Sequence, residues 1–242
     1  MPTRADYRRH YEDFTADIIK LCTDRAVRRD LQDGRGRPVK ECTRMHRYLT
    51  VRTTGHGHRR AHYTLASLIA LTDPLQELRT RPTPPLPPSN PAEPTAVPSP
   101  SDSALRSEPA TAPTGLQTAP SGESDTTPAG DASESEQPDP YATAVWRKRP
   151  NLGTTLARAV RKARFDEDRT DDLLHVIVHV DDDHLHQHIL PSLIDRLLRA
   201  GLVPDWPVLL DDLAHRVFDP DDVATRWLDA FYLTLNPPKD RT

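Results

Sequence analysis

Residues 145–164 read VWRKRPNLGTTLARAVRKAR, with seven Lys or Arg residues and no Asp or Glu. On a helix, at about 100° per residue, Arg158, Arg161 and Lys162 fall on one face. The apolar residues fall on the opposite face: Leu152, Leu156, Ala159, Val160 and Ala163. This stretch predicts a helix with one buried stripe and one cationic stripe. Such a helix suits a polyanion, most often nucleic acid, while a solvated basic face is the open alternative.

Composition divides the 242-residue chain into three parts. Of its 25 prolines, 15 lie between residues 79 and 143, among Ser, Thr, Ala, Gly and acidic residues. Such a stretch buries too little apolar surface to offset the entropy of ordering, so it predicts a disordered linker, partly polyproline II. We expect a helical domain over 1–78 and a helical bundle over 144–242. Their lengths allow two small cores or one shared core.

Charge differs strongly between these parts. Residues 1–78 carry +5, the Pro-rich acidic linker over 79–143 carries −6, and residues 144–242 carry −3. The formal net charge of −4 therefore conceals basic regions that are local.

The cysteine content and the hydropathy of the sequence indicate the cellular compartment of the protein. Cys22 and Cys42 are too few for a disulfide framework or a Cys-based zinc site. The first residues, MPTRAD, lack the apolar core of a signal peptide, and no apolar run approaches the length of a bilayer span. We expect a cytoplasmic protein that has no membrane partner.

The first half of the chain predicts three helical segments. One long helix is expected from the apolar spacing at its start, ending near Asp33-Gly34, where Gly takes a left-handed conformation. A basic loop follows at 35–38, and then a shorter helix or turn around 41–48. A third helix is expected over 59–71, burying Tyr63, Leu65, Leu68 and Ile69. The long first helix rests on Tyr7, Tyr11, Phe14, Ile18, Leu21, Val27 and Leu31.

The second half predicts helices that begin at capping residues. Asn151 is the expected N-cap of the basic helix, and another helix covers about 171–180. A third begins at Asp181–Asp183 and runs to about residue 200, with a kink or interruption at Pro191. Asp205-Trp206-Pro207 and Asp219-Pro220 open the last two helices. Strand-like alternation is confined to 176–180, so the fold class is all-α.

Five histidines within 14 residues suggest a metal site. His175/His179 and His184/His188 have the i,i+4 spacing that can hold a metal on one helix face, with His186 between them. No HExxH motif, Cys partner or Gly-framed loop accompanies them. A solvated patch that binds metal adventitiously is the expectation, and no native metal or cofactor is predicted.

Signatures of an enzyme are absent from the sequence. It has no GxSxG, P-loop or GxGxxG motif, and we expect its acidic pairs, such as Asp211-Asp212 and Asp221-Asp222, to lie at helix starts or on surface faces. A dense cationic cluster lies instead at the end of the long helix of the first half. It consists of Arg28 and Arg29 on the helix and of Arg35, Arg37 and Lys40 after it. Guanidinium groups pair with phosphate without reading bases, and no aromatic residues alternate with these cations. Backbone contact without sequence readout is therefore expected.

Three segments of the second half have recognisable motifs: Leu152-Gly-Thr-Thr-Leu156-Ala-Arg158, Val203-Pro-Asp205-Trp206-Pro-Val-Leu-Leu210 and Trp227–Leu233. In this order they resemble the small subunit (CasB family) of the type I-E CRISPR Cascade complex. The first is similar to that family's Leu-Gly-Arg-Ala-Leu helix start, the second to its Val-x-Asp-Trp-x-x-Leu-(Leu/Met), and the third to its final helix. In the first half, Arg28-Arg29, a Gly-bearing loop and Met45-His-Arg-Tyr48 match its Arg-rich loop and aromatic turn.

Two departures from the family pattern matter. Thr154 stands where the family usually has Arg, so one phosphate contact is missing or is taken by Arg158. The Pro-rich segment is much longer than the family's usual connection. A long surface insertion is tolerated because closure entropy grows only logarithmically with length.

The resemblance implies a non-catalytic subunit that contacts nucleic acid in a guided complex. Its partners would be the large subunit, the backbone subunits, a second copy of itself, the crRNA, and the target and displaced DNA strands. It would stabilise target binding and the R-loop in antiviral defence. The residues assigned to nucleic-acid contact are Arg28, Arg29, Arg35, Arg37, Arg147, Lys148, Arg149, Arg158, Arg161, Lys162 and Arg196.

Two alternatives come from other features. One is a metal-dependent helical phosphohydrolase that uses the His175–His188 cluster. The other is a scaffold whose Pro-rich arm binds a groove through a PxxP-like segment such as Pro84-Pro85-Leu86-Pro87-Pro88. The small-subunit interpretation treats this arm as a linker.

Overall fold

The computed structural model describes residues 3–72 and 139–237, and all regular secondary structure in these two ranges is helical. The predicted all-α class is confirmed. The linker predicted over 79–143 lies outside the described residues up to residue 138. The helices of the first half are α1 (Arg4–Leu21), α2 (Arg25–Gln32), η1 (Val39–Glu41), α3 (Thr43–Thr53) and α4 (Arg59–Ile69). Those of the second half are α6 (Thr143–Trp146), α7 (Leu152–Ala163), α8 (Glu167–His179), α9 (Asp182–His184), η2 (Leu185–Ile189), α10 (Leu190–Arg199), α11 (Trp206–Arg216) and α12 (Pro220–Leu235).

The long first helix of the prediction is wrong, because the chain breaks between α1 and α2. Asp24 is the cause: its Oδ1 accepts hydrogen bonds from the backbone N–H groups of Ala26, at 2.7 Å, and Val27, at 3.3 Å. These bonds satisfy the free N–H groups of a new helix start. Val27 and Leu31 therefore belong to a separate helix, α2.

The glycine that takes the left-handed conformation is Gly36 (φ +69°), and the prediction of Gly34 is wrong. Gly34 packs against α3 instead, and a Cβ there would lie 1.9 Å from Sδ of Met45, so that side chain would have to move. The helix predicted around 41–48 begins later and runs longer, as α3. The helix predicted over 59–71 is α4, which buries Tyr63, Leu65, Leu68 and Ile69 as expected.

The capping residues predicted in the second half are confirmed. The side chains of Asn151, Asp181, Asp205 and Asp219 each accept a hydrogen bond from the first turn of the helix that follows. The interruption expected at Pro191 is also present, as the π-helical turn η2 between α9 and α10. Pro191 has no N–H to donate to the carbonyl four residues earlier, so the α-helical ladder cannot continue through this point.

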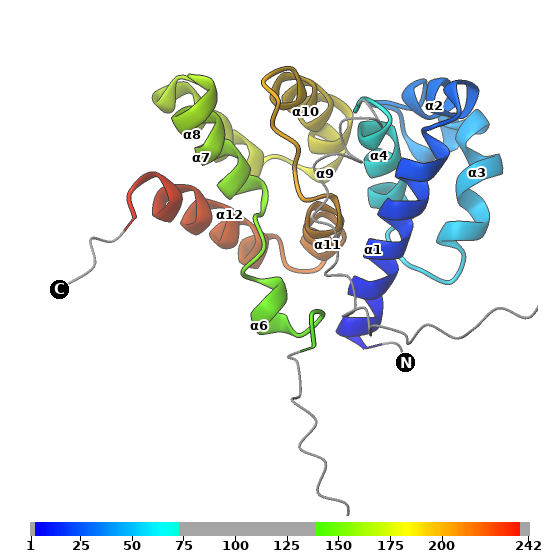
Figure 1. Cartoon of the computed structure of the whole chain (residues 1–242), viewed down its shortest axis with the longest axis horizontal. Coiled ribbons are helices and arrows are strands. Elements are labelled where there is room, and N and C mark those ends of the chain that lie inside the picture. The colour runs from blue at the N-terminus through cyan, green and yellow to red at the C-terminus, as the bar shows by residue number, and fades with distance from the viewer. Residues whose placement is uncertain (1–2, 73–138, 238–242) are drawn as a thin grey trace, which may run out of the picture. The chain divides into compact units, whose positions relative to one another are not determined.

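Both halves contribute to one shared core, the second of the two arrangements that their lengths allow. The described parts of both halves belong to the same compact unit. Helices α1 and α4 pack on α11, α4 also contacts α10, and α7 and α8 pack on α12. Figure 1 shows α11 between α1 and α12. Buried residues from each half, including Phe14, Leu65, Leu210 and Trp227, lie in a single cluster.

A buried arginine joins the two halves where the second one begins. Arg8 on α1 is 1% exposed and donates hydrogen bonds to the carbonyl of Tyr141, at 2.8 Å, and to Oγ1 of Thr143, at 3.1 Å. These bonds tie α1 to the start of α6, the first helix of the second half.

Candidate nucleic-acid interface

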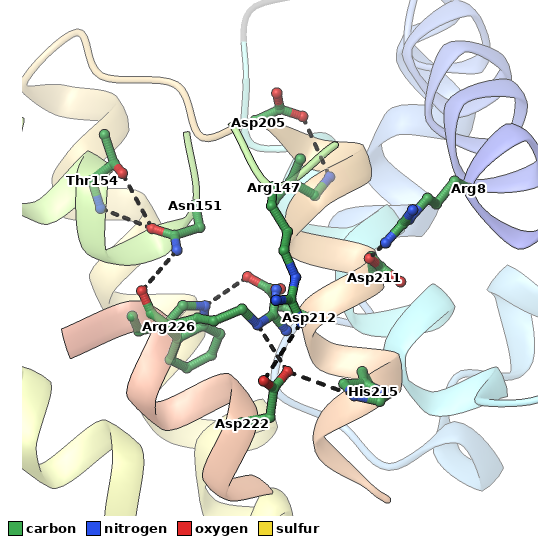
Figure 2. Close-up of polar contacts among 12 residues, drawn as sticks. Arg8, Arg147, Asn151, Thr154, Asp205, Asp211, Asp212, His215, Asp222 and Arg226 are labelled. Atoms are coloured by element: carbon green, nitrogen blue, oxygen red, sulfur yellow. Dashed lines mark hydrogen bonds and ion pairs between the residues drawn. The ribbon is translucent and has the colours of Figure 1, made fainter. Parts of the chain in front are cut away.

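The basic helix α7 is held on α12 by its N-cap residue. Oδ1 of Asn151 accepts from the backbone N–H of Thr154 at 3.0 Å, and Nδ2 donates to the carbonyl of Arg226 on α12 at 3.0 Å. One side chain thus starts α7 and fixes its end against the neighbouring helix (Figure 2).

Gly153 allows α7 to approach α12 at the next residue. A Cβ at this position would lie 1.9 Å from the carbonyl oxygen of Trp227, so only glycine permits the crossing. The Leu152-Gly153 pair that carries the family resemblance therefore serves helix packing.

Beneath the crossing lies a carboxyl group that is fully buried. Asp212 on α11 is 0% exposed; its Oδ2 accepts from Nε1 of Trp227 at 2.6 Å, and its Oδ1 lies 2.8 Å from Nη1 of Arg226. Burial raises the pKa of Asp212 to about 6, although Arg226 and the indole N–H oppose this shift. Arg226 also donates from Nε to Asp222 at 3.1 Å (Figure 2). This network locks α11 to α12 and so fixes the surface on which α7 rests.

The cationic face of α7 forms one wall of a groove of about 430 Å³. Its lining consists of Thr154, Arg158, Arg161, Lys162 and Thr234. Arg161 donates from Nη1 to the carbonyl of Thr234 at 3.1 Å, which places its guanidinium near the negative end of the α12 dipole. The three cationic side chains are exposed, and the lining contains no acidic residue. The groove is therefore a concentrated site of positive charge.

The three cations just before α7 have different surroundings. The guanidinium of Arg149 donates from Nε and Nη2 to the two carboxylate oxygens of Asp205, at 2.8 Å each, and from Nη1 to Glu12. It also lies 4.5 Å from the Trp146 ring centroid. These partners raise its pKa against the opposing effect of burial. Arg149 thus joins α1, α6 and α11, and its guanidinium is paired within the fold.

The other two cations before α7, Arg147 and Lys148, are exposed. Nη2 of Arg147 lies 3.7 Å from Asp222, too long for a hydrogen bond, and Lys148 faces solvent. Arg196 on α10 is also exposed and places its guanidinium 4.2 Å from the ring centroid of Phe165. Arg147, Lys148 and Arg196 remain available for contact with a ligand.

The cationic cluster of the first half also contains one arginine that is bonded within the fold and others that are exposed. Nε of Arg28 donates to the carbonyl of Ala70 at 3.0 Å, so this side chain covers the end of α4. Arg29, Arg35 and Arg37 are exposed. Arg37 also lines a depression of about 290 Å³ that contains the acidic residues Asp30, Asp33 and Glu41, which reduce its local positive charge.

The loop that carries Arg35 and Arg37 is held against the second half of the chain. A Cβ at Gly36 would lie 2.6 Å from the carbonyl oxygen of Gln187 in η2 and 3.9 Å from Pro191. The interrupted helix thus provides the docking point for the basic loop, and Gly36 makes the close contact possible.

The five histidines of the His175–His188 cluster, which the alternative of a metal-dependent enzyme requires, do not converge. The rings of His175 and His179 lie 6.5 Å apart and those of His184 and His188 lie 4.9 Å apart, while His186 is buried with Nδ1 2.9 Å from Oγ1 of Thr64. Across residues 3–72 and 139–237, no group of three or more His, Cys, Asp or Glu side chains is arranged to hold a metal ion.

Three other histidines, His10, His56 and His62, contact one another where α1 packs against α4. Nε2 of His10 lies 3.1 Å from Nε2 of His62, and the ring of His10 stacks on that of His56 with centroids 3.4 Å apart. Burial lowers the pKa of both His10 and His62 to about 4. The imidazoles of His10 and His62 are therefore neutral at physiological pH, and the contact between them packs α1 against α4.

Sequence reasoning missed Thr234 as a wall of the groove. It lies near the end of α12 and reaches the groove only because α12 crosses α7. No spacing within either helix signals a contact over this sequence distance.

Two solved chains share this fold. One comes from a structure described as a CRISPR RNA-guided surveillance complex, pre-nicking, with a TM-score of 0.61 and 22% identity over 94% of each chain. The other comes from a CRISPR RNA-guided surveillance complex, with a TM-score of 0.61 and 21% identity over 95% of each chain. No family model and no curated protein sequence matches the chain.

Hydropathy gives one further finding. Among the helices described here, none combines the length and the apolar character needed to cross a bilayer.

Proposed function

We propose that this chain is a non-catalytic small subunit of a type I-E CRISPR Cascade complex, and that it binds nucleic-acid backbone without reading sequence. The observation that carries the proposal is the α7–α12 groove, where three cations meet and no acid lines the wall. Its support is the likeness in fold to chains from CRISPR RNA-guided surveillance complexes over nearly the whole length.

The chemistry of the groove favours phosphate as the ligand. Arg158, Arg161 and Lys162 supply charge, and the hydroxyl groups of Thr154 and Thr234 supply hydrogen bonds. None of the five lining residues is aromatic, so the groove offers no platform for base stacking. Sequence specificity would come from the guide, and this subunit would supply contacts that are the same for every target.

Such contacts have a defined role in a guided complex. Exchanging a DNA duplex for an RNA–DNA hybrid is nearly balanced in free energy, so a few phosphate contacts can shift it toward the R-loop. The partners in this role are the large subunit, the backbone subunits, a second copy of the chain, the crRNA, and the target and displaced strands. Arg29, Arg35, Arg37, Arg147, Lys148 and Arg196 would extend the contact beyond the groove.

Charge reversal in the groove tests the proposal in the assembled complex. Arg158→Glu, Arg161→Glu and Lys162→Glu are combined, and R-loop formation is measured on a matched target. A control combines Lys20→Glu, Arg59→Glu and Arg169→Glu, which are exposed residues on α1, α4 and α8. We expect R-loop formation to weaken at least tenfold in the groove variant alone. Equal behaviour of the two variants, or a chain that never co-purifies with a crRNA, would contradict the proposal.

A further inference from the structure

Two histidines from neighbouring helices meet inside the first half of the chain. Nε2 of His10 on α1 lies 3.1 Å from Nε2 of His62 on α4, and His62 is 0% exposed. The orientation of His62 is fixed by a second contact, since its Nδ1 lies 3.1 Å from the main-chain carbonyl oxygen of His58. His58 has a left-handed backbone (φ 60°), which is costly for a residue other than glycine. The fold thus holds both imidazoles in one arrangement.

This arrangement determines which ring nitrogens carry hydrogen. A carbonyl oxygen can only accept, so Nδ1 of His62 is protonated and donates to His58. In a neutral His62 the other nitrogen, Nε2, then has a lone pair and accepts from Nε2–H of His10. A second proton on His62 would set two N–H groups against each other at 3.1 Å. The contact between α1 and α4 therefore requires a neutral His62.

The surroundings of His10 also disfavour a positive charge. Its ring stacks on that of His56 with centroids 3.4 Å apart and an interplanar angle of 3°. The rings of Tyr11 and Phe14 lie on α1 beside it, with centroids at 5.9 and 6.1 Å. Burial is the main cause that lowers the pKa of both His10 and His62 to about 4, and neighbouring imidazoles lower it further.

The charged and titratable groups on the elements packed around this pair have partners of their own. The groups whose charge acts on His10 and His62 are themselves histidines. On the neighbouring elements, Asp211 pairs with Arg4 and Arg8, His215 with Asp222, His46 with the hydroxyl of Tyr63, His186 with Thr64, and Arg28 with the carbonyl of Ala70. A proton taken up by the pair would therefore gain no free carboxylate from these residues.

His10 lies on α1 between two residues that reach the second half of the chain. Arg8 donates to the carbonyl of Tyr141 at 2.8 Å, and Glu12 pairs with Arg149 just before α7. Helix α1 packs on both α4 and α11, and Figure 1 shows α1 and α4 side by side. A movement of α1 away from α4 would thus disturb its contacts with the second half as well.

We propose that His10 and His62 form an acid-sensitive contact that holds α1 on α4 while both imidazoles are neutral and weakens as either takes up a proton. The folded chain binds these protons less tightly than the unfolded chain, in which histidine has its ordinary pKa of 6.5. The stability that the pair contributes is therefore fully present above about pH 6.5 and is lost as pH falls toward 4. The contact works in the same way whether or not the chain binds nucleic acid.

The proton positions can be tested on the parent chain. Long-range ¹H–¹⁵N spectra show which ring nitrogen carries hydrogen, and His10→Gln and His62→Gln assign the signals. At pH 7.5 we expect hydrogen on Nδ1 of His62 and on Nε2 of His10, and this pattern should persist to about pH 5. Hydrogen on Nε2 of His62, or titration of either ring near pH 6.5, would overturn the proposal.

The combined His10→Gln, His62→Gln variant tests the effect on stability, because glutamine is polar but does not titrate. Urea denaturation gives the unfolding equilibrium constant of parent and variant at pH 7.5 and at pH 4.5. Between these values the constant of the parent should rise at least about 30-fold more than that of the variant. His184→Gln removes an exposed histidine on α9 and should behave as the parent does. An equal rise in the parent and the combined variant would show that this pair is not acid-sensitive.

Discussion

The Cα of Gly153 faces the main-chain carbonyl of Trp227, with only 1.9 Å between that oxygen and the place where a Cβ would stand. This contact sets the distance between α7 and α12, and the cationic groove lies between the same two helices. The geometry of the proposed interface thus depends on a residue that carries no charge.

Gly153→Ala is expected to destabilise the protein by about 2 kcal/mol, because backbone must move to admit the methyl group. Urea denaturation measures the change. Gly57→Ala is the matched control, since a Cβ there meets nothing within 4 Å and its φ is not positive. The control should stay within about 0.5 kcal/mol of the parent. Equal stability of the two variants would show that α7 and α12 are not in this close contact.

Asp212 is expected to make stability fall as pH rises through the acidic range. Its pKa is about 6 in the folded chain against an ordinary value of 3.8, so the folded state binds the proton more tightly than the unfolded state. The contribution of this group is therefore most favourable below about pH 4 and is lost as pH rises to 6. Asp212→Asn removes this dependence.

Unfolding free energies of the parent and of Asp212→Asn, measured from pH 4 to 7, test this expectation. The stability of the parent relative to the variant should decline by about 2 kcal/mol over this range, since each pKa unit corresponds to about 1.4 kcal/mol and part of the shift is already expressed at pH 4. A constant difference, or one that grows with pH, would mean that Asp212 is ionised as easily in the folded state as in the unfolded chain.

Arg149 and Lys148 are adjacent cations with different expected roles. Arg149→Ala removes the cation that pairs with the half-buried carboxylates of Asp205 and Glu12 and should cost about 2 kcal/mol of stability. Lys148→Ala changes an exposed side chain and should cost less than about 0.5 kcal/mol. Thermal unfolding of both variants separates the roles, and a loss of the same size in each would refute the structural role of Arg149.

Local features of the sequence were enough to predict most of the fold. Asn151, Asp205 and Asp219 predicted helix starts correctly because capping involves only a residue and the turn that follows it. Asp24 was missed because an aspartate within an apolar pattern fits an exposed helix position equally well. Gly34 and Gly36 were confused because which of them packs against Met45 is decided by α3, not by the turn itself.

The candidate site could be predicted only in part. Arg158, Arg161 and Lys162 share a face because they belong to one helix, and the structure places them in one groove. Charge alone could not separate Arg149 from its neighbours, since its partners Glu12 and Asp205 are distant in sequence. The same holds for Arg28, whose acceptor is the carbonyl of Ala70. Contacts between distant segments thus decide which cations remain free.

The salt dependence of oligonucleotide binding by the full chain tests the central claim most directly. Arg158→Gln, Arg161→Gln and Lys162→Gln remove three positive charges from the groove, and Lys20→Gln, Arg59→Gln and Arg169→Gln remove three from other exposed sites. Affinity for a single-stranded DNA is measured over a series of salt concentrations. The slope of log affinity against log salt is negative, because binding releases counterions. If the groove binds phosphates, the groove variant should make this slope less steep by about 2, while the control retains the parent slope. A groove variant that retains the parent slope would contradict the assignment of α7 to nucleic-acid binding.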